Sequence, residues 1–157
     1  MPRASYVNGR FVPHVRATVH IEDRGFQFAD GVYEVIGVFG GCLIDSEEHL
    51  DRLERSLREL RMVPPLGRTS LKLILRETLR RNYVENGKIY IQISRGVAVR
   101  DHAFPPAAKS SLVVTASHGS WPSPVESKTG HAVVTGPDLR WQRCDIKSVS
   151  LLPNLLA

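Results

Sequence analysis

The sequence predicts an α+β fold: a complete two-layer N-terminal domain with a mostly antiparallel sheet and two helices, followed by the first strands of an incomplete, β-rich second domain. Three observations lead to this prediction. Several short segments alternate apolar and polar residues and are bounded by glycine-containing turns. Two longer stretches instead repeat leucine at helical spacing. A segment rich in proline, serine and glycine then separates these elements from the last part of the chain.

The first strands are expected to form two hairpins. An Asn-Gly pair at 8–9 and a Gly-Gly pair at 40–41 each follow β-prone residues, and tight hairpin turns need positive φ. In the strand before the second turn, successive side chains point to opposite faces of the sheet. One face therefore carries Tyr33, Val35 and Gly37, whose small residues leave room for a ligand as readily as for a neighbouring side chain, and the other carries Val32, Glu34, Ile36 and Val38.

Two helices are predicted where the apolar period changes from two to 3.6 residues. The first is expected to begin at Asp45, which can cap it while Glu48 reaches back, and to end before the Pro-Pro pair. The second should begin at Thr69 or Ser70 and stop at the Asn-Gly pair at 86–87. Three surface ion pairs are expected on the first helix: Glu48 with Arg52, Asp51 with Arg55, and Glu54 with Arg58.

The remaining segments define the expected domains. Alternation predicts strands at 88–96 and 110–117, and the segment between them has too many prolines to form a regular element. We expect an N-terminal domain at 1–117, a linker at 118–130 and the start of an incomplete C-terminal domain at 131–157. In this last part, strands are predicted at 131–136 and 140–146 and the entry to a helix at 151–157.

The composition excludes several classes of protein. Hydrophobic residues make up 42% of the chain, which excludes a disordered polymer. No apolar run is long enough to span a bilayer and the first residues lack a secretory signal, so we expect a cytoplasmic protein without a membrane partner. Cys42 and Cys144 match no metal-binding spacing, so they are expected to be small buried thiols, and no metal is expected.

A nucleic-acid-binding module is an alternative suggested by the net charge of +5. Such a module needs a one-sided basic surface with aromatic platforms. Here the arginines of the first helix are interleaved with acids at pairing distance, and only 7% of the residues are aromatic. Nucleic acid is therefore not expected as a partner.

Four basic side chains are candidates for chemistry. Lys147 lies in an apolar stretch, where loss of solvation favours the neutral, nucleophilic amine that forms Schiff bases. The alternative, which local sequence alone favours, is a lysine whose stem packs while its head stays in water. Arg100 and His102 lie two apart in an irregular loop and can either hold a carboxylate or remain solvated. Arg52 can pair with Glu48 or turn toward a ligand phosphate.

Four blocks of the sequence together carry a resemblance to a known family. "IEDRGFQFADGVYEV", "EEHLDRLERS", "ISRGVAVRDHAFP" and "RCDIKSVSLLPNLLA" occur in the order and at the spacing of the fold-type-IV pyridoxal-phosphate enzymes. The chain resembles this group, which contains branched-chain and D-amino-acid transaminases and aminodeoxychorismate lyase, over nearly its whole length. The resemblance implies pyridoxal 5'-phosphate as cofactor and transamination between D-amino acids and 2-oxo acids. The R-x-H-x-F-P pattern favours the D-amino-acid branch, and the other two activities remain the alternatives.

The resemblance also implies a role for each candidate residue. Lys147 matches the catalytic lysine that forms a Schiff base with the cofactor and moves the proton between the substrate Cα and the cofactor. Arg52 matches the arginine that contacts the cofactor phosphate. Tyr33, Arg100 and His102 match the trio that traps the substrate carboxylate in the D-amino-acid branch.

Three further expectations concern assembly, the substrate side chain and completeness. In the family, the loop with the arginine and histidine reaches across from a neighbouring subunit, which implies a homodimer. Val35, beside Tyr33, would shape the space near the substrate side chain. Relatives continue beyond "LLPN" with an acidic partner for the pyridine nitrogen and a cradle for the phosphate, so the chain is expected to be a fragment with little activity alone. A non-catalytic dimerisation module is the alternative of another class.

Overall fold

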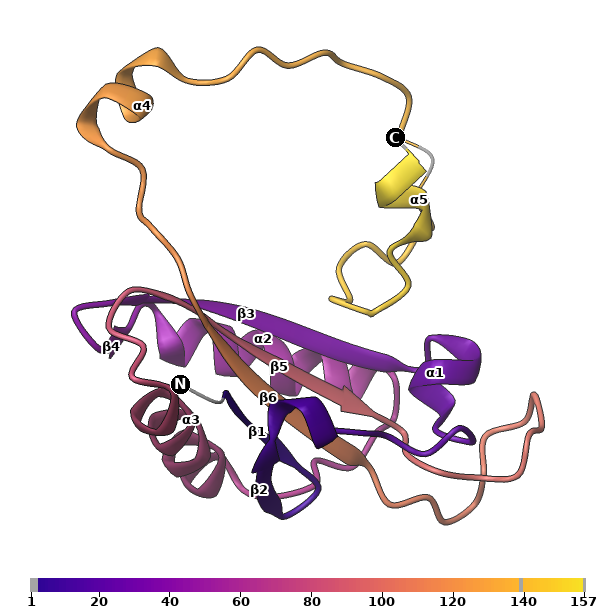
Figure 1. Ribbon diagram of the computed structural model, residues 1–157. Coiled ribbons are helices and arrows are strands. Elements are labelled where there is room, and N and C mark those ends of the chain that lie inside the picture. Colours follow the sequence, from indigo (N-terminus) through magenta and orange to yellow (C-terminus); the bar gives the residue numbers. More distant parts are fainter. Residues whose placement is uncertain (1–2, 139, 157) are drawn as a thin grey trace.

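The computed structural model describes residues 3–138 and 140–156. Most of the secondary structure lies before residue 119 (Figure 1). In chain order, the elements are β1 (Ala4–Val7), β2 (Arg10–Pro13), the 3-10 turn η1 (His14–Arg16), α1 (Arg24–Phe28), β3 (Gly31–Phe39), β4 (Cys42–Leu43), α2 (Ser46–Glu59), α3 (Arg68–Asn82), β5 (Gly87–Ser94), β6 (Ser111–His118), α4 (Pro124–Thr129) and α5 (Leu152–Leu156).

One six-stranded sheet organises the fold. Its order is β2-β1-β6-β5-β3-β4, and each neighbouring pair is antiparallel. The three longest strands, β3, β5 and β6, lie side by side in the middle (Figure 1). The predicted α+β class with a mostly antiparallel sheet and two helices is confirmed.

The two predicted hairpin turns are confirmed and have the expected backbone conformation. Asn8 and Gly9 join β1 to β2 with φ values of 45° and 100°. Gly40 and Gly41 join β3 to β4 with φ values of 55° and 76°. Positive φ carries little steric cost for glycine, and asparagine tolerates it better than most residues, so these pairs suit the sharp reversal of the chain.

The core lies between one face of the sheet and the helices α2 and α3. The predicted alternation in β3 is confirmed, because Val32, Ile36 and Val38 are fully buried on this face. The leucines at helical spacing face them from both helices. The largest fully buried aliphatic side chains of this layer are Ile36, Leu50, Leu53, Leu57, Leu75, Ile89, Ile91, Ile93 and Leu112.

The predicted helix ends are only partly correct. Asp45 precedes α2 with a left-handed conformation, φ 48° and ψ 38°, and its side chain makes no capping hydrogen bond. A capping side chain normally extends from a residue in the β region, so this backbone conformation explains the missing cap. The predicted cap of the second helix is also wrong: α3 begins at Arg68, so Thr69 and Ser70 lie inside it, and the preceding Gly67 has no side chain that could cap it. The same helix ends at Tyr83, a left-handed residue, before the predicted stop at 86–87.

The three predicted ion pairs on α2 are wrong for the described residues. Asp51 and Glu54 instead accept hydrogen bonds from Arg68, at 2.6 and 3.3 Å, because the start of α3 brings this guanidinium across both carboxylates. Arg52 and Arg55 also bond to residues outside α2. Contacts between elements have therefore replaced the contacts along the helix surface.

The last part of the chain differs from the predicted strands. Within the described residues, 131–138 and 140–146 contain no strand, and Val133 and Val134 are exposed. A strand needs a neighbour for its backbone hydrogen bonds, and no other described segment pairs with these residues. The helix predicted to begin near residue 151 is present as α5, whereas Leu139 and Ala157 lie outside the described residues. The domain boundaries remain predictions.

The expectation of buried thiols is wrong, since Cys42 lies on the short edge strand β4 and Cys144 in an irregular segment, and both are exposed. No helix in 3–138 or 140–156 has the length and hydropathy needed to cross a membrane.

Candidate functional site

The segment that carries Lys147 lies along the free edge of β3. The backbone N–H of Tyr33 donates to the carbonyl oxygen of Lys147 at 3.0 Å, and Val149 N–H donates to the Gly31 carbonyl at 3.1 Å. An isolated antiparallel bridge lies between these two bonds. The short strand β4 pairs only with the far end of β3, which leaves this half of the edge for residues 147–149.

Helix α2 holds the same segment from its other side. The Ser56 hydroxyl, which is buried, accepts a hydrogen bond from Lys147 N–H at 3.3 Å. Arg55, which directly precedes Ser56 on α2, donates to both the carboxylate and the backbone carbonyl of Asp145. The backbone of Lys147 is thus fixed between α2 and β3.

The side chain of Lys147 lies over an aromatic pair. Its Nζ atom is 4.3 Å from the centre of the Tyr33 ring, close enough for a cation–π contact. Tyr33 stacks on Tyr90 with ring centroids 5.7 Å apart. Burial, with a smaller contribution from Tyr33, raises the pKa of Tyr90, whose hydroxyl donates to Gln92 at 2.7 Å. Tyr90, the ring of this stacked pair that lies beneath Tyr33, is therefore neutral at physiological pH.

A cavity of about 150 Å³ opens beside Lys147. Its lining combines an indole with a guanidinium, serine hydroxyls and an amide, which are groups that suit an aromatic ligand bearing negative charge. The residues that line it are Tyr33, Arg140, Trp141, Cys144, Ile146, Lys147, Ser148, Ser150, Leu151 and Asn154.

A buried carboxylate lies next to Tyr33 on the core face of β3. Glu34 is fully buried and accepts two hydrogen bonds from Arg52, Nε to Oε1 at 2.6 Å and Nη2 to Oε2 at 2.7 Å. The Nδ1 atom of His49 lies 2.8 Å from Oε2. Burial raises the pKa of Glu34, but the hydrogen bonds from Arg52 and His49 outweigh it and lower the pKa below its ordinary value.

Arg52 is therefore occupied by a protein carboxylate in this structure. The hydrogen bond to Glu34 raises the pKa of Arg52. The arginine side chain remains 45% exposed, and it does not line the cavity beside Lys147. Glu34 was not predicted as the partner of Arg52, although the sequence pattern contains a signal: Glu34 is in phase with buried aliphatic residues, and a buried carboxylate requires a cation.

Two members of the predicted carboxylate-binding trio, Arg100 and His102, gather on one phenylalanine, whereas the third, Tyr33, lies beside Lys147. The Arg100 guanidinium carbon is 5.1 Å from the centre of the Phe28 ring, and the His102 and Phe28 centroids are 5.7 Å apart. Both basic side chains are exposed. Neither lines the cavity beside Lys147, so the described chain brings Arg100 and His102 together with each other but not with the lysine.

The open face of β3 is only partly free. Val35 lies half-buried opposite Tyr90 in the sheet, next to Tyr33. The space at Gly37, which the sequence suggested could admit a ligand, is filled by Trp121: a Cβ atom on this glycine would lie 3.0 Å from the indole. The indole N–H donates to the Val38 carbonyl at 2.9 Å. The room near Tyr33 and Val35 is thereby closed at one end.

Comparison with known proteins assigns the chain to a family. The model of the family "Amino-transferase class IV" matches residues 31–157. The chain belongs to the class IV aminotransferases. It is 44% identical to a D-alanine aminotransferase of Staphylococcus haemolyticus over 156 residues, which are 97% of this chain and 54% of the relative. A D-alanine aminotransferase of Listeria monocytogenes serotype 4b (strain F2365) is 40% identical over 153 residues, 96% of this chain and 53% of that one.

Solved class IV structures have the same fold. The branched-chain amino acid aminotransferase of Escherichia coli aligns with a TM-score of 0.72 at 19% identity, covering 80% of this chain and 43% of that one. The 4-amino-4-deoxychorismate lyase of Pseudomonas aeruginosa aligns with a TM-score of 0.59 at 25% identity, covering 75% and 41%. This class IV chain spans about half the length of the curated relatives it matches.

We predict that Glu34→Gln lowers the stability of this aminotransferase chain by about 1–3 kcal/mol at pH 7, because Arg52 and His49 lose a charged acceptor. Since the pKa of Glu34 is lowered by folding, the unfolded chain binds the proton more tightly, and the stabilisation is lost as pH falls below 4.5. Urea unfolding from pH 7 to pH 3 should therefore show the difference between the two proteins shrinking.

The exposed Glu85→Gln provides the matched control and should differ little from the unsubstituted chain throughout. A difference for Glu34→Gln that stays constant across this pH range would contradict the assigned ion pair.

Proposed function

We propose that this chain is part of a pyridoxal-phosphate-dependent transaminase, a cytoplasmic homodimer that transfers the amino group of a D-amino acid to a 2-oxo acid. In this proposal, Lys147 is the cofactor lysine, and Arg100 and His102 form a clamp for the substrate carboxylate. The observation that carries the proposal is the fixed position of Lys147 over Tyr33, through backbone hydrogen bonds to β3. The names of the relatives at 39–44% identity support the choice of D-amino acids.

The residues around Lys147 fit such a cofactor. Lys147 would hold it through the ε-amine, which borders a cavity lined by hydroxyl and amide groups. Arg52, which does not line that cavity, would contact the phosphate through Nη1: this atom makes no hydrogen bond within the described residues, whereas Nε and Nη2 bond to Glu34. Pyridoxal phosphate, when bound, withdraws electrons from the substrate Cα. A solved branched-chain amino acid aminotransferase, complexed with N-(5'-phosphopyridoxyl)-L-glutamate, shares this fold.

Each candidate residue then has a task that its surroundings support. The Lys147 amine moves the proton at the substrate Cα as a general base and acid, and its position over the Tyr33 ring limits the directions from which it can act. Arg100 offers a planar fork that matches a carboxylate, and His102 and the Tyr33 hydroxyl each add one further donor. Val35, half-buried beside Tyr33, borders the substrate side chain.

The separation of these groups within one chain supports the proposed homodimer. Arg100 and His102 rest on Phe28 and do not line the cavity beside Lys147. A clamp and a proton-transferring amine must face the same substrate, since catalysis requires the reacting groups to be oriented together. We therefore assign the clamp of one subunit to the lysine of another.

We predict that pyridoxal phosphate followed by borohydride labels Lys147 of the 157-residue chain in preference to its other lysines. The reason is that Lys147 alone among the described lysines borders the donor-lined cavity beside Tyr33. Peptide mapping by mass spectrometry should find the reduced pyridoxyl group on Lys147. In the control Lys147→Arg, no remaining lysine should be labelled to the extent that Lys147 is in the unsubstituted chain. Uniform labelling would instead support a non-catalytic dimerisation module.

We predict a substrate effect for Arg100→Ala in a chimera that joins residues 1–157 to the part of the Staphylococcus haemolyticus relative beyond the match. Loss of a charge-assisted hydrogen bond should raise KM for D-alanine about 10- to 100-fold, with a smaller change in kcat. Steady-state kinetics would be compared with Arg16→Ala, an exposed arginine that serves as control. Equal effects of Arg100→Ala on D-alanine and on an amine without a carboxylate would rule out the clamp.

A further inference from the structure

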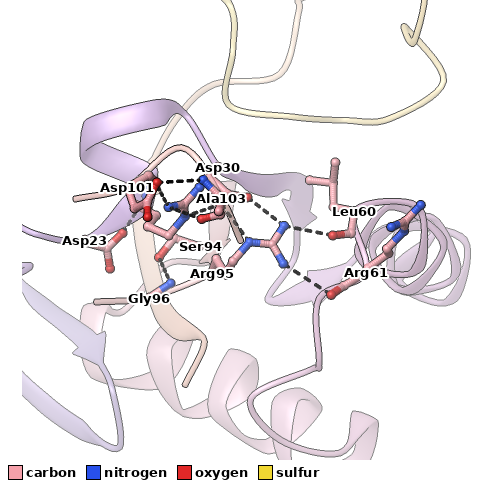
Figure 2. A network of polar contacts seen from close by, with 11 residues as sticks. Asp23, Asp30, Leu60, Arg61, Ser94, Arg95, Gly96, Asp101 and Ala103 are labelled. Atoms are coloured by element: carbon pink, nitrogen blue, oxygen red, sulfur yellow. Dashed lines mark hydrogen bonds and ion pairs between the residues drawn. The ribbon is translucent and has the colours of Figure 1, made fainter. Parts of the chain in front are cut away.

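Two buried arginines share one aspartate at the end of the sheet that lies near α1. Arg24 Nε donates to Asp30 Oδ2 at 2.7 Å, while Arg95 donates through Nε and Nη2 to the two carboxylate oxygens at 2.7 and 2.9 Å. The side chains of Arg24, Arg95 and Asp30 are 3%, 8% and 8% exposed. Figure 2 shows Asp30 beside Arg95 in this network. None of the three residues has a task in the proposed transamination.

The aspartate keeps both guanidinium groups in place. Burial raises the pKa of Asp30, but hydrogen bonds from Arg95 and Arg24 outweigh this effect and lower it, so the carboxylate stays charged. Arg95 extends from Asp30 to the carbonyl oxygens of Leu60 and Arg61, at 2.9 and 3.3 Å, just beyond the end of α2 (Figure 2). The network is thereby anchored to the helical layer.

Arg24 reaches the loop that contains the clamp. Its Nη1 atom donates to the carbonyl oxygens of Asp101 and Ala103, at 2.6 and 3.3 Å, which are the residues on either side of His102. These are the only hydrogen bonds that tie residues 100–104 to the rest of the described chain. The remaining one, from Ala103 N–H to the Asp101 carboxylate, lies within the loop.

The same arginine also supports the ring on which the clamp rests. The guanidinium carbon of Arg24 is 4.7 Å from the centre of Phe28, and that ring also contacts Arg100 and His102. The loop is further held by Phe104, whose ring centre is 3.9 Å from the Arg95 guanidinium carbon. Arg24 thus contacts both the backbone on either side of His102 and the Phe28 ring against which the His102 ring packs.

We propose that Arg24, held by Asp30, is a positioning residue that presents Arg100 and His102 as one carboxylate clamp. The proposal rests on the proposed function, because the clamp has a substrate only if the chain belongs to a transaminase. A surface loop fixed before substrate binds avoids the entropic cost of ordering it on binding. Arginine suits the task because its rigid fork can bridge a carboxylate and two carbonyl oxygens, whereas the single ammonium group of lysine cannot match this geometry.

The test is NMR spectroscopy of the 157-residue chain with Arg24→Lys, which retains the charge beside Asp30. In the unsubstituted chain, backbone order parameters of residues 100–104 should approach those of β5, and the Phe28 ring current should shift the His102 ring protons. In the variant, the order parameters should fall below about 0.6. The His102 protons should move to the shifts of an exposed histidine, while β5 stays unchanged.

Arg16→Lys is the matched control, since Arg16 is exposed and makes no hydrogen bond to the loop in the described residues. A loop whose order parameters and His102 shifts are unaffected by Arg24→Lys would overturn the positioning role. Equal loosening of β5 would also overturn it, because Arg24 would then support the whole fold. The order parameters and the His102 shifts are measured without cofactor or turnover, so they test the role of Arg24 alone. A failure of the proposed transaminase function would appear separately, in the labelling of Lys147.

Discussion

The hydrogen bonds between residues 147–149 and the edge of β3 determine where the candidate site lies. Without them, the N–H of Tyr33 and the carbonyl of Gly31 would lack a partner, which a half-buried sheet edge tolerates poorly. Because these contacts involve backbone atoms, they specify the position of Lys147 independently of its side chain. Ser56 on α2 adds a third point of attachment. The sheet and α2 therefore fix the backbone of Lys147 beside Tyr33, and its amine lies over the Tyr33 ring.

Two buried carboxylates organise the cations around this frame. Glu34 lies within β3 and orients Arg52 from the helix layer, while Asp30 immediately precedes β3 and gathers Arg24 and Arg95 near the loop. Each carboxylate is stabilised as an anion by arginine despite the cost of its burial. The strand thereby carries an aromatic platform on one face and an electrostatic anchor on the other.

The sequence predicted features that depend on local periodicity, such as the hairpin at 8–9 and the alternating faces of β3. It failed where long-range contacts decide the outcome. Arg52 bonds to Glu34 and not to Glu48, because a buried charge has more to gain from a partner than a solvated one. The grouping of Arg100 and His102 on Phe28 likewise depends on loop packing, which spacing in the sequence does not specify.

Amide hydrogen exchange at the edge of β3 tests the docking of the lysine segment most directly. The N–H groups of Tyr33 and Val35 point to the same edge, but only the first donates a hydrogen bond within the described residues. We predict that the Tyr33 amide exchanges much more slowly than the Val35 amide under native conditions. Equally fast exchange of both amides would show that Lys147 is not held beside β3 and would contradict the placement of the site.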